Sequence, residues 1–434
     1  MRYHSLNKSA PESSFRNAVI RGLAPDKGLY FPNEIPKLPD SFFKDIHSLS
    51  HSEIAYEVIK SFVLPEIEED ELKRIVEETL SFEFPIVQLN DQISVLELFH
   101  GPTMAFKDVG ARFMARCLGH FNQDNNEKVT VLVATSGDTG GAVANGFLGV
   151  KGVDVVILYP SGKVSEIQEK QLTTLGQNIT ALEVDGVFDD CQDMVKRAFL
   201  DTDLTDSIQL TSANSINVAR WLPQMFYFLF AYKALYQKHK ELVFSIPSGN
   251  FGNICAGMMA QQMGLPVKTF IASNNSNNVV TEYLNTEKFV PKPSVQTISN
   301  AMDVGNPSNF IRILNLYKND FEVLKNNLVS YSFDDEETRQ AMSEIFEQFE
   351  YIADPHGAVG YLGAKEYLKE HPNAHMVFLE TAHPTKFLDV VEDTIEKKLE
   401  LPEQIKAVID KPKSSVRIES YNQLKAFLLS NRAN

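Results

Sequence analysis

The sequence predicts an α/β protein with parallel β-sheets that helices cover on both faces. After residue 90, short β-branched runs alternate with segments of helical periodicity. The runs are almost continuously apolar, which is typical of parallel strands buried on both faces. The predicted strands are 95–99, 129–134, 153–159, 242–247, 267–272 and 376–379. Ligands bind such folds at the carboxyl ends of strands, so functional residues are expected in the turns that follow them.

Composition and charge exclude several classes of protein. The chain has 434 residues, a hydrophobic content of 43% and a net charge of −16, and no cluster of Lys and Arg offsets that charge. A nucleic-acid partner is therefore not expected. The longest apolar stretch, 225–232, is too short to cross a bilayer, and the polar start lacks a secretory signal, so we expect no membrane partner and a cytoplasmic location. The odd, widely spaced Cys117, Cys191 and Cys255 are predicted to be buried thiols.

Three regions are predicted along the chain. Residues 1–90 have mainly helical periodicity, with apolar faces that include Val58 and Ile75. A change of character near 214–222 separates a smaller α/β domain, residues 91–220, from a larger α/β domain, residues 221–434. The smaller domain would carry Lys107 and the turn at 136–139, and the larger one the turn at 249–253 and Thr381.

Two glycine-rich turns each connect a predicted strand to a predicted helix. The first is Ser136-Gly137-Asp138-Thr139, and the second is Gly249-Asn250-Phe251-Gly252-Asn253. Small residues let backbone amides approach an anion at a helix N-terminus, although a plain connection is the alternative for each turn. Neither turn has the dinucleotide-binding or Walker pattern. Two such turns in one chain favour a ligand with two anionic groups, such as a phosphate and a carboxylate.

Lys107 and two histidines are candidates for chemistry. Lys107 follows the strand 95–99 near the start of a helix, and an amine among apolar residues has the lowered pKa that a Schiff base requires. The alternative is a solvated lysine paired with Asp108. His356 and His383 lie in or beside loops, as structural residues or as acids and bases. No metal site is predicted, because Pro372 interrupts the helix between His371 and His375, and the zinc-protease pattern is absent.

Six motifs taken together resemble threonine synthases of the longer-chain branch. The motifs are residues 97–108, 134–142, 212–217, 247–253, 300–307 and 381–387. Their order and spacing also match, and the resemblance extends over essentially the whole chain. It implies a pyridoxal-phosphate (PLP) enzyme of fold type II, similar to the tryptophan synthase β subunit, with the cofactor bound between two α/β domains.

The resemblance assigns roles to the candidate residues. Lys107 would bind pyridoxal 5'-phosphate covalently and act as the catalytic base. Gly249, Asn250, Phe251, Gly252 and Asn253 would bind the cofactor phosphate, and the Thr381 hydroxyl would face the pyridine nitrogen. The substrate would be O-phospho-L-homoserine, which reacts with water to give L-threonine and phosphate. Its carboxylate would contact Ser136, Gly137 and Thr139, and its phosphate would contact Thr139, Asn214, Ser215 and Arg220, with Lys163 as a weaker candidate.

Asp138 departs from the pattern of other fold-type-II enzymes, which often carry asparagine at this position. An ionised carboxylate cannot donate a hydrogen bond to the cofactor's phenolic oxygen. Either a proton is shared with that oxygen, or Asp138 turns away and caps the following helix.

Other functions remain open at this point. A related PLP-dependent phospho-lyase or a threonine or serine dehydratase would release a keto acid and ammonia, and a dehydratase would not need Arg220 and Ser215. A non-catalytic binding module would lack the reactive amine of Lys107. We also expect a monomer.

Overall fold

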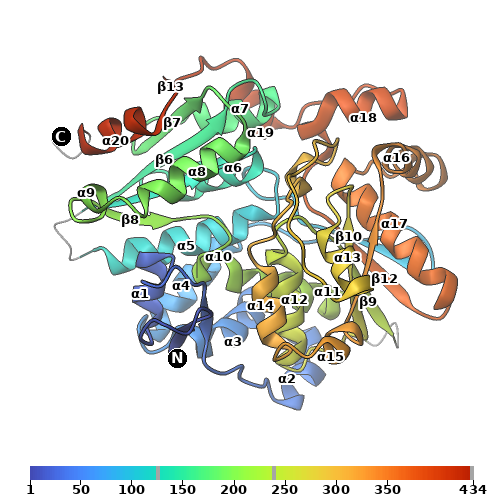
Figure 1. Cartoon of the computed structure of the whole chain (residues 1–434). Helices are drawn as coiled ribbons and strands as arrows, with labels where there is room; N and C mark the ends of the chain where they lie inside the picture. Colours follow the sequence, from blue (N-terminus) through green and yellow to red (C-terminus); the bar gives the residue numbers. More distant parts are fainter. Residues whose placement is uncertain (124–127, 237–240, 431–434) are drawn as a thin grey trace.

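The computed structural model describes residues 1–434 apart from 124–127, 237–240 and 431–434. Figure 1 shows two large sheets in separate lobes, with the N-terminal helices packed beneath them. In the described residues, the six-stranded sheet has the order β11 (Leu328–Ser332), β10 (Thr269–Asn274), β9 (Leu242–Pro247), β12 (His375–Glu380), β4 (Ile93–Glu97) and β3 (Ile86–Gln88). The five-stranded sheet has the order β13 (Val416–Ile418), β7 (Ile179–Val184), β6 (Val153–Pro160), β5 (Val129–Ala134) and β8 (Gln209–Ser212). The remaining pair is β1 (Tyr3–Ser5) with β2 (Tyr30–Pro32).

Both large sheets are parallel, with one exception at an edge. β3 runs antiparallel to β4, whereas the other neighbouring strands run parallel. Successive residues of β5 belong to different cores: Val131 and Val133 pack in one cluster, and Leu132 and Ala134 pack in another. Helices therefore cover both faces, which confirms the predicted fold class.

Helices supply the other layers of both lobes. Those in the N-terminal region are α1 (Phe15–Arg21), α2 (Asp40–Asp45), α3 (His51–Val63) and α4 (Glu69–Thr79). The five-stranded lobe has α5 (Lys107–Phe121), α6 (Asp138–Phe147), α7 (Glu166–Thr173), α8 (Phe188–Ala198), α9 (Thr202–Thr205), α19 (Glu403–Ile409) and α20 (Tyr421–Ser430). The others are α10 (Val218–Trp221), α11 (Met225–Ala234), α12 (Gly252–Gln262), α13 (Val279–Thr286), α14 (Phe310–Leu316), α15 (Phe321–Lys325), α16 (Asp335–Phe349), α17 (Pro355–Glu370) and α18 (Leu388–Ile395). Short 3-10 helices are η1 (Ile46–Ser48), η2 (Leu222–Gln224), η3 (Asn300–Met302) and η4 (Pro384–Phe387).

The chain passes between the two sheets more often than the predicted division allows. β4 falls in the predicted smaller domain, 91–220, but pairs with β12 of the six-stranded sheet. β13 falls in the predicted larger domain, 221–434, but pairs with β7 of the five-stranded sheet, and Figure 1 shows β13 and α20 beside that lobe. The predicted domain boundaries are therefore corrected: β4 belongs to the six-stranded sheet and β13 to the five-stranded sheet. Strand pairing is a tertiary contact that joins distant segments, so the order of the residues along the chain does not reveal it. The mainly helical character predicted for residues 1–90 agrees with α1–α4.

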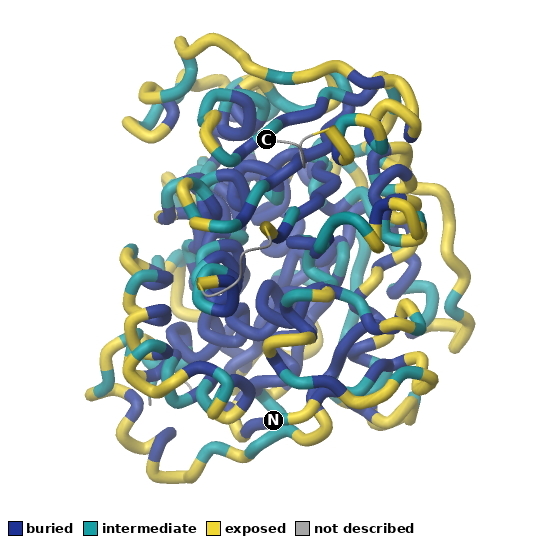
Figure 2. Tube along the Cα trace, turned by 90° about the vertical axis from the view of Figure 1, so that its left-hand side faces the viewer, coloured by how far each residue is buried: buried dark blue, intermediate teal, exposed yellow. Residues whose placement is uncertain are grey.

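One apolar core joins the N-terminal helices to both lobes. Figure 2 shows the buried residues concentrated at the centre of the molecule and the exposed ones on its periphery. Val58 and Ile75 from the predicted helical faces lie in this core, together with Met225–Ala231 of α11. A helix that is apolar on all sides is stable only when fully buried, which explains the longest apolar stretch of the sequence. In the described part of the chain, none of the helices has both the length and the apolar character that a membrane crossing requires.

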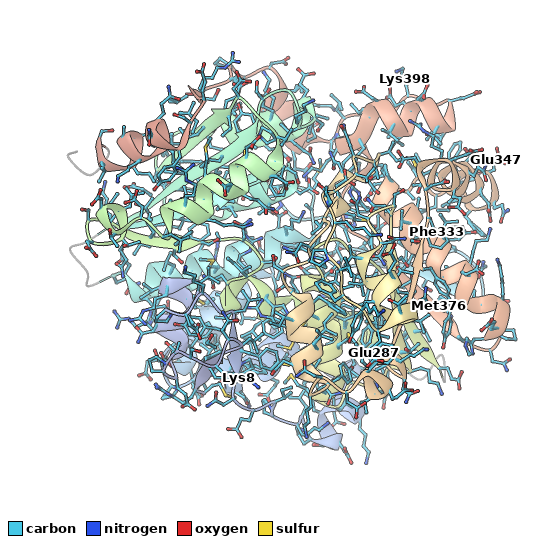
Figure 3. All side chains as sticks on the ribbon, in the orientation of Figure 1. Lys8, Glu287, Phe333, Glu347, Met376 and Lys398 are labelled. Atoms are coloured by element: carbon cyan, nitrogen blue, oxygen red, sulfur yellow. The ribbon has the colours of Figure 1, made fainter. Side chains whose placement is uncertain are left out.

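Individual side chains show the same contrast between a buried centre and an exposed periphery. Figure 3 shows Met376 of β12 inside the six-stranded lobe and Lys398 at the edge of the molecule. The three cysteines Cys117, Cys191 and Cys255 are buried and free, as predicted.

α17 carries three glycines on the face that packs against the six-stranded sheet. Gly357, Gly360 and Gly363 recur at every third residue of the helix, which packs across β9, β10 and β12. A Cβ atom at Gly363 would lie 2.0 Å from Ser273 Oγ, whereas one at Gly360 would meet Pro247 Cδ at an ordinary 3.4 Å. At Gly363 the backbone of α17 therefore lies against the side chain of Ser273 in the sheet, and no space remains for a Cβ atom.

The close approach predicts different effects of the same substitution at two positions. We expect Gly363→Ala to lower the free energy of unfolding by roughly 1 to 2 kcal/mol, because overpacking outweighs the better helix propensity of alanine. Gly360→Ala is the matched control and should be neutral or slightly stabilising. Urea unfolding of both variants measures the difference, and equal stability of the two would contradict the close-packing argument.

Candidate active site

A cavity of about 400 Å³ lies where the segments that follow β5, β9 and β12 meet. Residues from both lobes line it, so the carboxyl ends of the two parallel sheets converge on one space. Of the residues predicted from the sequence, the cavity brings together Lys107, Ser136, Asp138, Thr139, Asn214, Ser215, Arg220, Gly249, Asn250, Phe251, Gly252, Asn253 and Thr381.

Two predicted residues are placed differently. Gly137 has a φ of +142° and packs against Gln168, and its amide donates to Thr135 Oγ1 at 3.0 Å, so the turn uses that amide internally. Lys163 is exposed in the turn after β6 and does not line the cavity. The amide of Lys163 donates to the carbonyl of Pro160, which closes that turn on the surface. The structure therefore gives no support to a substrate contact at Lys163.

Lys107 is the first residue of α5 and borders the cavity. Its Nζ lies 5.5 Å from the ring centroid of Phe106. Asp108, the alternative partner, instead accepts hydrogen bonds from Thr103 N at 2.9 Å and Thr103 Oγ1 at 2.5 Å. Since Asp108 is occupied by its own turn, it does not hold the Lys107 amine as an ion pair.

Burial lowers the pKa of Lys107 below its ordinary value. The positive charges of Lys386 and Arg220 lower this pKa further, and the carboxylates of Asp138 and Asp354 raise it. The net reduction increases the fraction of unprotonated amine, which is the form that attacks a carbonyl carbon.

The backbone around Lys107 is anchored to the opposite lobe. Phe106 N donates to the carbonyl of Thr381 at 2.8 Å, and the Tyr227 hydroxyl donates to the carbonyl of Phe106. Thr381 lies at the end of β12 and is 6% exposed. The first hydrogen bond therefore fixes the backbone next to Lys107 against the Thr381 segment.

The turn at 249–253 presents the N-terminus of α12 to the cavity. Phe251 adopts the left-handed conformation with φ +61°, and a Cβ at Gly249 would lie 2.7 Å from Met302 Cα. The Asn253 side chain donates to the carbonyl of Pro247 at 2.9 Å and ties the turn to β9. The first amides of a helix have no acceptor within it, so α12 offers them and its positive end to an anion.

Arg220 belongs to the interior of the protein. It is 3% exposed, its Nη1 donates to the carbonyl of Ala213, and its Nε has no hydrogen-bond partner. Among the described residues no carboxylate forms an ion pair with it, and burial lowers its pKa to about 10. Arg220 is therefore not a surface residue of its helix, and an unpaired buried guanidinium beside the cavity is suited to an anionic ligand.

Ser215 and Asn214 connect the Arg220 segment to the other turns. The Ser215 hydroxyl accepts from Asn250 Nδ2 at 3.1 Å and from Asn309 Nδ2 at 2.9 Å. Asn214 Nδ2 donates to the carbonyl of Ala134 at 3.0 Å. The three turns that follow β5, β8 and β9 are therefore held in register by side-chain amides.

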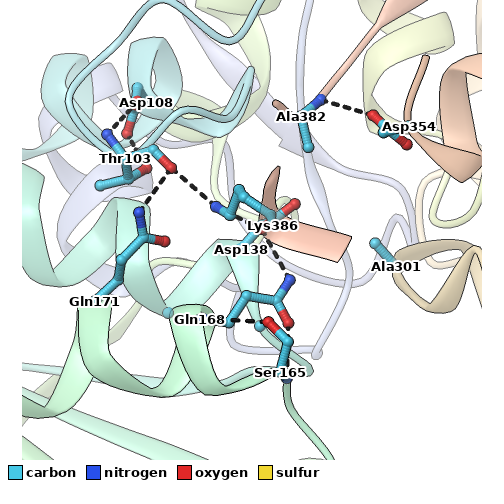
Figure 4. A network of polar contacts seen from close by, with 12 residues as sticks. Thr103, Asp108, Asp138, Ser165, Gln168, Gln171, Ala301, Asp354, Ala382 and Lys386 are labelled. Atoms are coloured by element: carbon cyan, nitrogen blue, oxygen red, sulfur yellow. Dashed lines mark hydrogen bonds and ion pairs between the residues drawn. The ribbon is translucent and has the colours of Figure 1, made fainter. Parts of the chain in front are cut away.

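The carboxylate of Asp138 does not cap α6. Its Oδ1 lies 2.7 Å from Lys386 Nζ and accepts from Gln168 Nε2 at 3.0 Å, as Figure 4 shows. Gly137 is the N-cap, and no side-chain hydrogen bond is made there. Burial alone would raise the pKa of Asp138, but Lys386 and Lys107 bring it below its ordinary value. Asp138 is therefore ionised, and it accepts hydrogen bonds on the cavity wall.

Sequence reasoning missed Lys386 and Gln168 and left His356 undecided. His356 lines the cavity, with Nδ1 2.6 Å from Asp354 Oδ1 and Nε2 accepting from Ala301 N at 3.2 Å. These bonds hold the loop at 300–306 against the cavity. The position of Lys386 within the motif at 381–387 was the available signal for that residue.

His383 lies outside the cavity that contains Lys107. It borders a smaller cavity of about 280 Å³ with Glu97, Phe99 and Tyr351. Its side chain accepts from Thr385 N, so it caps η4. His383 is therefore placed as a structural residue.

A larger cavity, of about 1200 Å³, adjoins the one that contains Lys107. The two share Ala134, Asn214 and Asn250 among their lining residues. Its remaining lining includes residues of α1, α8 and β8, and it contains none of the groups suited to covalent chemistry described above. We therefore regard the cavity of about 400 Å³ that contains Lys107 as the candidate active site.

Comparison with known proteins gives a consistent result over the whole chain. Family models match residues 85–381 (Pyridoxal-phosphate dependent enzyme), 2–80 (Threonine synthase N terminus) and 357–428 (Threonine synthase, C-terminal). The chain is 42% identical to a threonine synthase of Buchnera aphidicola subsp. Acyrthosiphon pisum, covering 99% of this chain and 100% of that one. It is 41% identical to a threonine synthase of Escherichia coli, covering 95% of each.

Solved structures agree. The crystal structure of threonine synthase from Escherichia coli superposes with a TM-score of 0.94 at 40% identity, covering 99% of this chain and 100% of that one. PLP-bound threonine synthase from Brucella melitensis gives 0.93 at 32% identity, covering 100% of both chains. A maize serine racemase, at 16% identity over 72% of this chain and 92% of its own, gives 0.55 and shows the shared fold alone.

The environment of His383 predicts a loss of stability in acid. Burial, with the charge of His100, lowers the pKa of His383 to about 4, from an ordinary value of 6.5. Between pH 6.5 and about 4, His383 binds a proton in the unfolded chain but not in the folded chain. Its contribution to the free energy of unfolding is therefore fully present above pH 6.5 and is lost as the pH falls.

We expect His383→Asn to recover roughly 1 to 2 kcal/mol of the stability lost between about pH 7 and pH 5. Asparagine retains a side-chain acceptor for Thr385 N. Urea unfolding of both proteins at the two pH values measures the effect. Between about pH 7 and pH 8 their difference should stay constant, and equal acid sensitivity of the two proteins would refute the prediction.

Proposed function

Because the chain belongs to the threonine synthase family of PLP-dependent enzymes, we propose that it converts O-phospho-L-homoserine and water to L-threonine and phosphate in this cavity. The observation that carries the proposal is the pairing of a reactive lysine with a separate, unpaired guanidinium. Lys107 is suited to the cofactor aldehyde, and Arg220 is suited to a second phosphate. A threonine or serine dehydratase has no phosphate to bind, so the buried Arg220 favours a phosphorylated substrate.

The residues present fit pyridoxal 5'-phosphate. An amine of lowered pKa at Lys107 suits its aldehyde, and the N-terminus of α12 at 249–253 suits its phosphate. The Thr381 hydroxyl suits the pyridine nitrogen, because it can donate to that atom or accept from it. When bound, the cofactor supplies an electron sink for the carbon atoms of the substrate.

Lys107 then serves as the base of the reaction. Its amine would remove a proton first from Cα and then from Cβ of the substrate. One base can act in several steps because α5 begins at Lys107 and places this residue at the cavity that would hold the substrate. Phosphate leaves from Cγ, water adds at Cβ, and the protons return.

The other polar residues orient the substrate. The turn at Ser136 and Thr139 begins α6 and would bind the substrate carboxylate at a helix N-terminus. Arg220, with Asn214 and Ser215, would bind the substrate phosphate and stabilise it as it leaves. These assignments separate the two phosphates, because α12 holds one and Arg220 the other. A cytoplasmic location and a monomeric state stay predictions.

Product identification tests the function. The purified holoenzyme is mixed with O-phospho-L-homoserine, and the organic product is identified by chromatography and mass spectrometry. L-Threonine with an equal amount of phosphate is expected. A keto acid and ammonia would indicate a phospho-lyase instead, and conversion of threonine or serine in the absence of phosphate would indicate a dehydratase.

Lys107→Ala should leave a folded protein that does not bind the cofactor covalently. Only a primary amine at this position can condense with the aldehyde. Borohydride reduction of the wild-type holoenzyme and peptide mapping should place the label on Lys107, with the alanine variant as control. A label on any other lysine would remove Lys107 from this role.

Arg220→Lys should lower kcat/KM for O-phospho-L-homoserine by roughly 10-fold to 100-fold. A point charge replaces a planar fork that can bind phosphate in two places, whereas cofactor binding depends on α12. Cofactor affinity, measured by absorbance titration, should change by less than about 3-fold. An equal loss of both quantities would place Arg220 outside the substrate site.

A further inference from the structure

Lys386 is a fully buried lysine to which the proposed reaction assigns no role. Its side chain is 0% exposed and comes from η4, just after the strand that ends at Glu380. Its Nζ lies 2.7 Å from Asp138 Oδ1 and donates to the carbonyl of Thr103 at 2.9 Å. Burying an ammonium group is costly, so its presence beside a reactive cavity calls for an explanation.

The ion pair joins the two lobes at the cavity wall. Asp138 begins α6 of the five-stranded lobe, whereas Lys386 follows β12 of the six-stranded sheet. Figure 4 shows Lys386 between Thr103 and Asp138, with Gln168 as the second donor to the carboxylate. Asp138 is therefore held by two groups that do not belong to its own helix.

Lys107 is a competitor for the same carboxylate. Four charged groups act on its amine: Asp138 and Asp354 favour its protonated form, and Lys386 and Arg220 disfavour it. Asp138 pairs with Lys386, and among the described residues no ion pair joins it to Lys107. A lysine that pairs with a buried carboxylate stays protonated and is a poor nucleophile. The reactivity of Lys107 therefore depends on whether Asp138 pairs with Lys386 or with Lys107.

We propose that Lys386 is a positioning residue that occupies the carboxylate of Asp138 and thereby keeps the amine of Lys107 unpaired and reactive. The inference rests on the proposed function only in taking Lys107 as the amine that binds the cofactor. It gives the buried ion pair a purpose that packing alone does not, because an uncharged pair of similar size would fill the same space.

The test measures the protonation of Lys107 directly. The full-length protein, freed of cofactor, is labelled briefly with 1-fluoro-2,4-dinitrobenzene over a range of pH, since this reagent reacts with an amine only in its unprotonated form. Peptide mapping gives the labelling of Lys107 relative to Lys8, which is exposed. Lys386→Met should raise the titration midpoint of Lys107 by roughly 1 pH unit, a decrease of about 10-fold in labelling near neutral pH.

Two further variants separate charge from packing. Lys386→Arg keeps the positive charge and should retain the wild-type midpoint. The double variant Lys386→Met with Asp138→Asn removes both charges, so Lys107 has no carboxylate to capture, and its midpoint should return to within about 0.5 pH unit of wild type. A purely structural role would give the single and double variants the same midpoint.

An unchanged or lowered midpoint in Lys386→Met would overturn the proposal. Circular dichroism checks the fold of each variant. Should Lys386→Met fail to fold, Asp138→Asn and the double variant decide: neither should raise the midpoint by more than about 0.5 pH unit, and a larger rise in either would overturn the proposal. The labelling does not depend on turnover, so its outcome is independent of which product the holoenzyme releases.

Discussion

Buried positive charge is the constraint on which the meeting of the two lobes depends. Arg220, Arg312 and Lys386 are at most 3% exposed, in a chain whose net charge is −16. A cation is stable in a protein interior only where other groups share its charge. Arg312 donates to the carbonyls of Ser215 and Ile216, and Lys386 pairs with Asp138. Arg220 Nε has no hydrogen-bond partner among the described residues, so an anionic ligand would supply the missing acceptor.

The parallel sheets explain why these charges can meet. The carboxyl ends of parallel strands lie on one edge, and each is followed by a turn and a helix N-terminus that favours negative charge. The turns after β5 and β9 supply two such termini, at α6 and α12. The hydrogen bond from Phe106 N to the Thr381 carbonyl then places the amine of Lys107 within the same space. Two anion sites and one amine thus follow from strand direction and a few long-range bonds.

A second layer of residues fixes the loops that surround the cavity. Arg312 lies 4.5 Å from the ring centroid of Trp221 and holds the Ser215 segment, while His356 and Asp354 hold the loop at 300–306. The carboxyl group of Glu380 is buried beside Asp354, and burial raises its pKa well above the ordinary value. These groups touch other side chains of the site, so they determine its shape and set the protonation of their neighbours.

The sequence by itself determined the fold class, six of the strands and the glycine turns, because apolar periodicity and turn chemistry are local properties. The resemblance to threonine synthases added Asn214, Ser215, Arg220 and Thr381 to the candidate site. The sequence identified Lys107 and the turn at 249–253 without their partners. Only the tertiary structure decided that β4 joins β12 and β13 joins β7, that Lys163 stays on the surface, and that Asp138 faces Lys386. Asp138 and Lys386 are 248 positions apart, and electrostatic partners at such separation are selected by the packing of the two lobes, which no local pattern encodes.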